Sequence, residues 1–210
     1  MNTIDALKWR YAVQKFDTEK KLTDEQLQKI LEATILSPSS FGLQPWKFIV
    51  VTNPEVRVKL REAGYGQPKI SEASHLIVFA VEKNIDDSLV DTYIKSVSGI
   101  RNIPVEGLMG YADTIKRSIA NKSMQERLEW ATRQVYIALG VTVTAASIEE
   151  IDSAPMEGFE PHKFDEILGL DKRGLESKVI LALGFRASDD PVAQYKKVRF
   201  PQDQVVIEVK

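Results

Sequence analysis

Residues 37–48 read Ser-Pro-Ser-Ser-Phe-Gly-Leu-Gln-Pro-Trp-Lys-Phe, and this stretch is the most informative part of the chain. Pro38 is expected to stop the helix that precedes it, because proline cannot continue a helix. The apolar run Ile49-Val50-Val51 follows and predicts a strand over residues 46–52. Serine hydroxyls, backbone amides and a flat aromatic side chain are crowded into this segment. That combination suits the binding of a flat cofactor with polar edges.

Length and composition limit the possible classes of protein. The chain has 210 residues, which predicts one domain over residues 1–210 with a full core. Its formal net charge is −2, from 28 basic and 30 acidic side chains, so no basic field attracts nucleic acid or an anionic membrane. There is no cysteine, and His75 and His162 lack metal-ligand spacing. We see no signal peptide or membrane-spanning run, and expect a cytoplasmic protein without nucleic-acid or membrane partners.

Capping residues and periodicity predict the elements of the first part of the chain. A short helix is expected over residues 3–9. Thr23-Asp24-Glu25-Gln26 forms a capping box that opens a second helix with its apolar side at Leu27, Ile30, Leu31 and Ile35. Asn53-Pro54 opens a third helix, because asparagine is a good cap and proline suits the first helical position. Residues 75–81 are nearly all apolar and predict a central strand covered on both faces, with His75 as a core or boundary histidine.

The later elements are less regular in pattern. Residues 86–120 predict two helices around Asn102-Ile103-Pro104, either as an excursion that shapes a binding slot or as a plain surface feature. A loop is expected at residues 153–159, a short helix near 162–168, and strands over 177–184 and 205–209. Strands and helices do not alternate strictly, which favours an α+β fold over a doubly wound sheet.

A long helix is predicted over residues 124–150, and its sequence is apolar almost all round. A helix with that composition is buried on all sides. Small residues would allow another backbone to approach closely, at Ala138, Gly140, Ala145 and Ala146. Two interpretations stay open: a central core helix, or a helix that also lies in a subunit interface.

The usual catalytic motifs are missing from the sequence. There is no Gly-x-Ser-x-Gly elbow, Walker loop or His-Glu-x-x-His motif, and the glycines at 64 and 66 lack the third glycine of a dinucleotide fingerprint. Two short basic segments remain, at residues 10–15 and 196–199. They could clamp one phosphate if the fold brings them together, with arginine as a bidentate fork and lysine as a point charge. Two exposed charge runs are the alternative.

Taken in order, these segments resemble the nitroreductase family of FMN-dependent NAD(P)H oxidoreductases, which includes oxygen-insensitive nitroreductases and dihydropteridine reductases. Six motifs in register carry the resemblance over nearly the whole chain: Arg10-Tyr11-Ala12-Val13-Gln14-Lys15-Phe16-Asp17, Ser37-Pro38-Ser39-Ser40 through Gln44-Pro45-Trp46, Gln67-x-Lys69 with Ala73-Ser74-His75, Trp130 through Gln134-Val135-Tyr136, Pro155-Met156-Glu157-Gly158-Phe159, and Lys197-x-Arg199-x-Pro201. The resemblance implies a nitroreductase-like fold, with a central mixed or antiparallel sheet flanked by helices, in an intertwined homodimer.

The resemblance also implies cofactor-binding residues. Arg10, Lys197 and Arg199 would hold the FMN phosphate, with Tyr11 and Ala12 near the ribityl and phosphate groups. The pyrimidine edge of the flavin would face Gln14, Gln67 and Lys69, and the ribityl side would face Gln134. Pro155, Glu157 and Gly158 would cover one ring face. The other subunit would contribute Pro38, Ser39, Ser40 and Gly42, and substrate would meet Phe41 and Lys69.

Two positions depart from the family pattern. Ala12 replaces a common serine, which removes one hydroxyl donor. Gln14 replaces a basic residue, and Lys15 is displaced by one position, so either side chain could contact the flavin. If Lys15 points away, the positive charge near flavin N1 falls to Lys69 alone. Positive charge there stabilises the anionic reduced flavin, so we predict a flavin that is harder to reduce.

The activity implied by the resemblance explains the missing acid–base residues, because hydride chemistry belongs to the flavin. The expected reaction is a ping-pong cycle in which NAD(P)H reduces FMN at N5 and a nitroaromatic or quinone then reoxidises it, with no side chain as catalytic acid or base. Other flavin chemistry of the same superfamily is one alternative, including flavin reduction or fragmentation and dehalogenation. A non-catalytic dimer, with or without flavin, is another.

Overall fold

The computed structural model describes all residues from 1 to 210 and is built around one antiparallel sheet. Its four strands lie in the order β1-β2-β4-β3, and every neighbouring pair is antiparallel. The strands span Trp46–Val51 (β1), His75–Glu82 (β2), Asp152–Met156 (β3) and Leu175–Gly184 (β4). Helices and strands are mixed without alternation, which confirms the α+β prediction.

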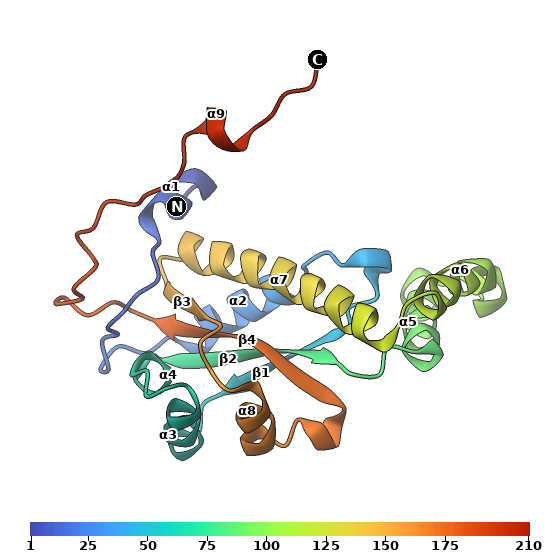
Figure 1. The fold of residues 1–210 in the computed structure, drawn as a ribbon, viewed down its shortest axis with the longest axis horizontal. Coiled ribbons are helices and arrows are strands. Elements are labelled where there is room, and N and C mark those ends of the chain that lie inside the picture. The colour runs from blue at the N-terminus through green and yellow to red at the C-terminus, as the bar shows by residue number, and fades with distance from the viewer.

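Helices cover both faces of the sheet (Figure 1). On one face lie α2 (Asp24–Ile35) and α7 (Met124–Ile148), and on the other lie α3 (Pro54–Ala63), α4 (Lys69–Glu72) and α8 (Pro161–Leu168). The remaining helices are α1 (Thr3–Trp9), α5 (Asp87–Arg101), α6 (Met109–Ala120) and α9 (Gln202–Val205), with short 3₁₀ turns at Ser40–Gly42, Val105–Leu108 and Asp171–Arg173.

The central strands are apolar on both sides because both sides are covered. Ile77 and Phe79 of β2 point into the core beneath α2 and α7, whereas Leu76 and Val78 point into the core above α3 and α8. This alternation is the two-residue period of a strand. It confirms the prediction of a doubly covered central strand at residues 75–81.

Local signals place most helix starts where they were predicted. Thr23 closes its capping box with Gln26, and the Asn53 side chain accepts a hydrogen bond from the Val56 amide at 3.1 Å. Residues 86–120 form α5 and α6, joined around the left-handed residue Asn102. The predicted helix at 124–150 is α7. No helix of the protein is both long enough and apolar enough to cross a membrane.

Two of the predicted elements are wrong. The segment expected to be a loop at 153–159 begins as strand β3. This strand tolerates Pro155 because it lies at the sheet edge, where β4 is its one strand neighbour and a single bridge joins Ser153 to Ala12. The run 205–209, expected to be a strand, begins with Val205, the last residue of α9, and continues outside any helix or strand. A β pattern forms a strand only where a neighbour supplies the hydrogen bonds of the ladder.

Arg57 of α3 is a buried cation that fixes the start of β2 and the end of α4. Its guanidinium donates to the carbonyl oxygens of Ile70 (2.8 Å), Ala73 (2.7 Å) and Ser74 (3.0 Å). Burial lowers its pKa to about 10. The three carbonyls give Arg57 hydrogen-bond partners without a carboxylate, and they tie the α4 segment to α3.

Candidate functional site

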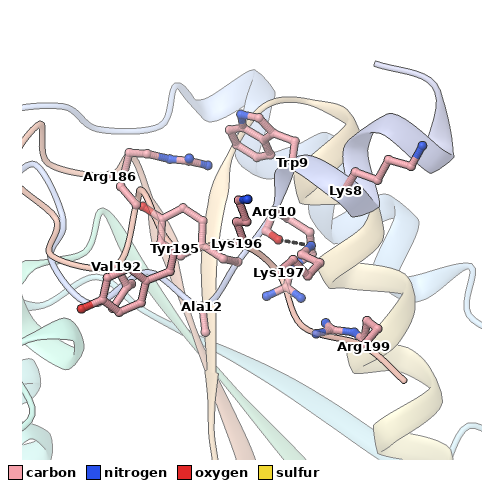
Figure 2. A pocket seen from close by; sticks show the side chains of 12 residues that line it. Lys8, Trp9, Arg10, Ala12, Arg186, Val192, Tyr195, Lys196, Lys197 and Arg199 are labelled. Carbon is pink, nitrogen blue, oxygen red and sulfur yellow. Dashed lines mark hydrogen bonds between the residues drawn. The ribbon is translucent and has the colours of Figure 1, made fainter. Parts of the chain in front are cut away.

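The two basic segments meet at one cavity of about 490 Å³, although 187 positions separate Arg10 from Lys197 (Figure 2). The cavity lies between the end of α1 and the C-terminal segment. Six cationic residues line it, namely Lys8, Arg10, Arg186, Lys196, Lys197 and Arg199. The fold therefore brings the two basic segments together, while residues 196–199 stay exposed.

The end of α1 explains why the segments come together. The Lys197 ammonium donates to the carbonyl oxygens of Leu7 and Arg10. The last carbonyls of a helix lack partners within the helix and carry its negative dipole end, so they attract a cation. Lys197 thus fastens the C-terminal segment to α1 and brings Arg199 towards Arg10 (Figure 2).

The cations in this cavity repel one another, and one of their buried nitrogen atoms lacks a hydrogen-bond acceptor. Burial, and then the charge of Arg199, lower the pKa of Arg10. Burial, and then the charges of Arg10 and Arg199, lower the pKa of Lys197. Arg10 Nε is also buried without a hydrogen-bond partner, which is costly for a charged donor. A phosphate would supply both the missing acceptor and the opposing charge.

Arg186 lines the same cavity but has its own partners. Its guanidinium forms an ion pair with the buried Asp152, with Nη2 and Oδ1 2.6 Å apart. It also lies 4.3 Å from the ring centre of Trp9 and 4.5 Å from that of Tyr11. Arg186 therefore forms part of the cavity wall, where Asp152 balances its positive charge and two aromatic rings stack on it. Sequence reasoning missed it, because Asp152 and Arg186 become neighbours only through the unpredicted pairing of β3 with β4.

A second polar cluster adjoins the cavity through residues 10–14. Ala12 forms an isolated bridge with Ser153 of β3, and the chain continues to Gln14. The Lys69 ammonium donates to Gln14 Oε1 at 3.2 Å, while Lys15 pairs with Asp189. Of the two side chains that could contact a flavin, Gln14 is therefore the one that meets Lys69.

The segment after β3 is held from two sides. Gln67 Nε2 donates to the carbonyl oxygen of Gly158 at 2.6 Å, and the Tyr136 hydroxyl donates to Glu157 Oε1 at 2.6 Å. Burial, and then the bond to Glu157, raise the pKa of Tyr136 to about 12. Gln67, Glu157 and Gly158 therefore lie together, and Pro155 lies just upstream in β3.

The Ser39–Gly42 loop lies elsewhere in the same subunit. The Ser40 amide donates to Gln134 Oε1 at 2.9 Å, near the middle of α7. The chain start lies at the far end of α7, where the Met1 ammonium donates to the Ile148 carbonyl. At about 1.5 Å of rise per residue, Gln134 and Ile148 are about 21 Å apart along the helix.

Figure 1 shows the same separation, with the loop near residue 40 towards the α5 end of α7 and α1 at the opposite end. Pro38 and Ser40 are exposed, whereas Ser39, Phe41 and Gly42 are half-buried. Gln134, expected on the ribityl side of the cofactor, accompanies this loop and not the Arg10 cavity.

Comparisons with known proteins agree on one family. The model described as "Nitroreductase family" matches residues 7–185. A protein of Staphylococcus epidermidis named "Putative NAD(P)H nitroreductase" is 35% identical, with 97% of this chain and 94% of that protein covered. A protein of Bacillus subtilis with the same description, YfkO, is 38% identical, with 89% of each chain covered.

A solved structure shares the fold. A "putative nitroreductase" from Exiguobacterium sibiricum, crystallised in complex with FMN, superposes with a TM-score of 0.85 at 21% identity. The superposition covers 100% of this chain and 98% of that one. The arrangement of helices around the antiparallel sheet is therefore shared over the full length.

Proposed function

The chain belongs to the nitroreductase family, and from this premise we propose that it is an FMN-dependent NAD(P)H oxidoreductase. Its acceptors would be flat aromatic compounds such as nitroaromatics and quinones. The observation that carries the proposal is the cluster of Arg10, Lys197 and Arg199, with the buried and unpartnered Nε of Arg10. Such a cluster suits a phosphate monoester, because charge-assisted bonds to phosphate are strong.

The residues beside the cavity fit the rest of an FMN molecule. Gln14, Lys69 and Gln67 present amide and ammonium groups of the kind that hydrogen-bond a pyrimidine edge. Glu157 and Gly158 would cover a ring face, held in place by Tyr136 and Gln67. When bound there, FMN would supply the hydride chemistry that links NAD(P)H to the acceptor. The protein groups would bind and orient the flavin, and we assign none of them the role of catalytic acid or base.

The proposed enzyme is a homodimer, because the site is incomplete within one subunit. Ser39, Ser40 and Gly42 lie far from the cavity of their own chain. In a dimer they would complete the partner's site. Apolar side chains that remain exposed support a partner, among them Tyr136 and Ile137 on α7 and Ile207 near the C-terminus.

Flavin binding is the decisive test. The purified protein, reconstituted with FMN, should show a yellow spectrum that NADH bleaches and menadione restores. Lys197→Ala should weaken FMN binding roughly tenfold to a hundredfold, because it removes one charge-assisted bond. Lys95→Ala, an exposed lysine on α5 without an ion pair, is the matched control and should leave binding unchanged. No flavin binding after reconstitution would refute the assignment.

The same preparation separates the alternatives. Turnover of NADH with a nitroaromatic supports the proposed acceptors. Flavin fragmentation or dehalogenation without that turnover would indicate another reaction of the superfamily. Calorimetry with FMN identifies a cofactor-free dimer by the absence of binding heat.

A further inference from the structure

The loop that carries Phe41 has a strained backbone. Phe41 has φ +58° and ψ 0°, Gly42 has φ +72°, and Gln44 has φ +50°. Residues other than glycine lose about 1–2 kcal/mol in this left-handed region. Strain of this kind persists where surrounding groups fix the conformation, and it is concentrated at binding sites and active sites.

Two tyrosines from the α5–α6 excursion hold this loop. The Tyr111 hydroxyl of α6 donates to the carbonyl oxygen of Phe41 at 2.8 Å. Tyr93 of α5 lies so close over Gly42 that a Cβ there would be 2.6 Å from its hydroxyl oxygen. The Gln134 side chain holds the neighbouring Ser40 amide from α7. The loop is therefore fixed from both sides.

The excursion is itself anchored to the body of the protein. Apolar residues of α5 and α6 join the core beneath α7, among them Val90, Ile94 and Ile115. Arg127 of α7 donates to the Ile85 carbonyl at 3.1 Å, just before α5. The position of Tyr111 is thus set by packing, whereas Phe41 keeps its ring half-buried at the surface of the loop.

We propose that Tyr111 is a positioning residue that fixes Phe41, so that the Phe41 ring forms a wall against which aromatic acceptors stack. This inference rests on the proposed function and deepens it. The contact between the excursion and the loop would then determine which acceptors bind. A flat π-system binds by stacking on the Phe41 ring, whereas a compact inorganic acceptor does not.

Tyr111 acts through Phe41 and not on the substrate. Its hydroxyl proton is engaged by the Phe41 carbonyl, so it has no free proton to donate. Tyr111→Phe removes that bond and keeps the ring. The loop then gains the freedom to leave its left-handed conformation.

The first test measures loop protection, and it does not depend on activity. Hydrogen exchange of the backbone amides at 40–44 should be about fivefold faster in Tyr111→Phe, as expected for the loss of one neutral hydrogen bond. Tyr65→Phe is the matched control, because Tyr65 is exposed and its hydroxyl makes no hydrogen bond within the protein. Unchanged exchange in Tyr111→Phe would overturn the positioning contact.

The second test measures acceptor recognition in the FMN-loaded enzyme. Tyr111→Phe should raise KM for menadione about fivefold, while KM for ferricyanide and for NADH stays the same. In a Phe41→Ala background the same substitution should have no further effect, because the ring through which Tyr111 acts is gone. An equal rise in KM for ferricyanide, or an undiminished effect in the Phe41→Ala background, would refute the inference. Failure of the wild-type protein to bind flavin would instead refute the proposed function, since the exchange test stands without flavin.

Discussion

Gln14 and Lys15 show how one position along the chain changes a site. They are consecutive, yet Gln14 meets Lys69 whereas Lys15 pairs with Asp189 on the outside. A basic residue at position 14 would add a second charge beside Lys69. In this protein an uncharged amide takes that place, and burial lowers the pKa of Lys69. A site with one partly buried ammonium stabilises an anionic reduced flavin less than a site with two cations.

Gln14→Arg should therefore raise the midpoint potential of bound FMN. An added charge close to the flavin edge should shift it by roughly 30 mV, which corresponds to about 1.4 kcal/mol for two electrons. Lys15→Gln is the matched control and should leave the potential unchanged, because Lys15 points to Asp189. The measurement is a spectroscopic redox titration at fixed pH, and an unchanged potential in Gln14→Arg would contradict the prediction.

Arg57 acts on stability at the same scale. Arg57→Met would leave three carbonyl oxygens without their donor, and it should lower the free energy of unfolding by about 3 kcal/mol. Lys59→Met, on the same helix, removes an exposed ammonium that has no ion pair and should cost under about 1 kcal/mol. Urea unfolding of both variants at one protein concentration gives the two free energies of unfolding to be compared. Equal stability of the two would show that the buried guanidinium does not anchor α4.

At the scale of elements, local signals in the sequence predicted most of the fold. The capping box of Thr23 and Gln26 and the Asn53 cap fix the starts of α2 and α3 through side-chain hydrogen bonds to residues three positions away. Such local contacts can be predicted without knowing the tertiary structure. Strand β3 lacked such a signal, because its pattern contains a proline and its pairing with β4 is distant in sequence. The run 205–209 shows the converse error, since it has a β pattern but no neighbour to pair with.

The middle of α7 carries a glycine that one subunit does not explain. A Cβ at Gly140 would meet no atom within 4 Å, and glycine inside a helix costs roughly 0.5–1 kcal/mol relative to alanine. Close approach of a partner helix would account for it. Gly140→Ala should then weaken the dimer about tenfold or more, as expected for overpacking.

Gly99 of α5 provides the control for this prediction. It is also helical and open, so Gly99→Ala should stabilise the fold slightly and leave association unchanged. Sedimentation equilibrium gives the dimer dissociation constant of both variants. Unchanged association in Gly140→Ala would place the dimer contact away from this turn of α7.

At the scale of the whole molecule, the candidate site joins segments that the sequence keeps apart. Proximity of Arg10 to Lys197 depends on the last turn of α1, where the Leu7 carbonyl accepts a hydrogen bond from Lys197. The sequence predicted this helix but not its role as an anchor. The contact between Gln134 of α7 and the Ser40 amide likewise depends on the fold. It forms because α2 and α7 pack side by side, with the hydroxyl oxygens of Thr34 and Thr142 2.9 Å apart. Residue types were readable from the sequence, whereas their grouping required the fold.

The C-terminal segment gives the last prediction. Val205, Ile207 and Val209 are 62%, 90% and 94% exposed, which is a large apolar surface for a chain end. Burying three such side chains against a partner would contribute several kcal/mol, at about 1.5–3 kcal/mol each. Removing residues 202–210 should therefore raise the dimer dissociation constant at least about a hundredfold, while Lys197 and Arg199 remain. A triple serine variant at the three apolar positions should reproduce the effect, and Glu208→Gln should not. Light scattering across a dilution series measures the dimer dissociation constant of each variant and of the full chain. An unchanged dissociation constant in the truncated protein would show that the segment lies outside the interface.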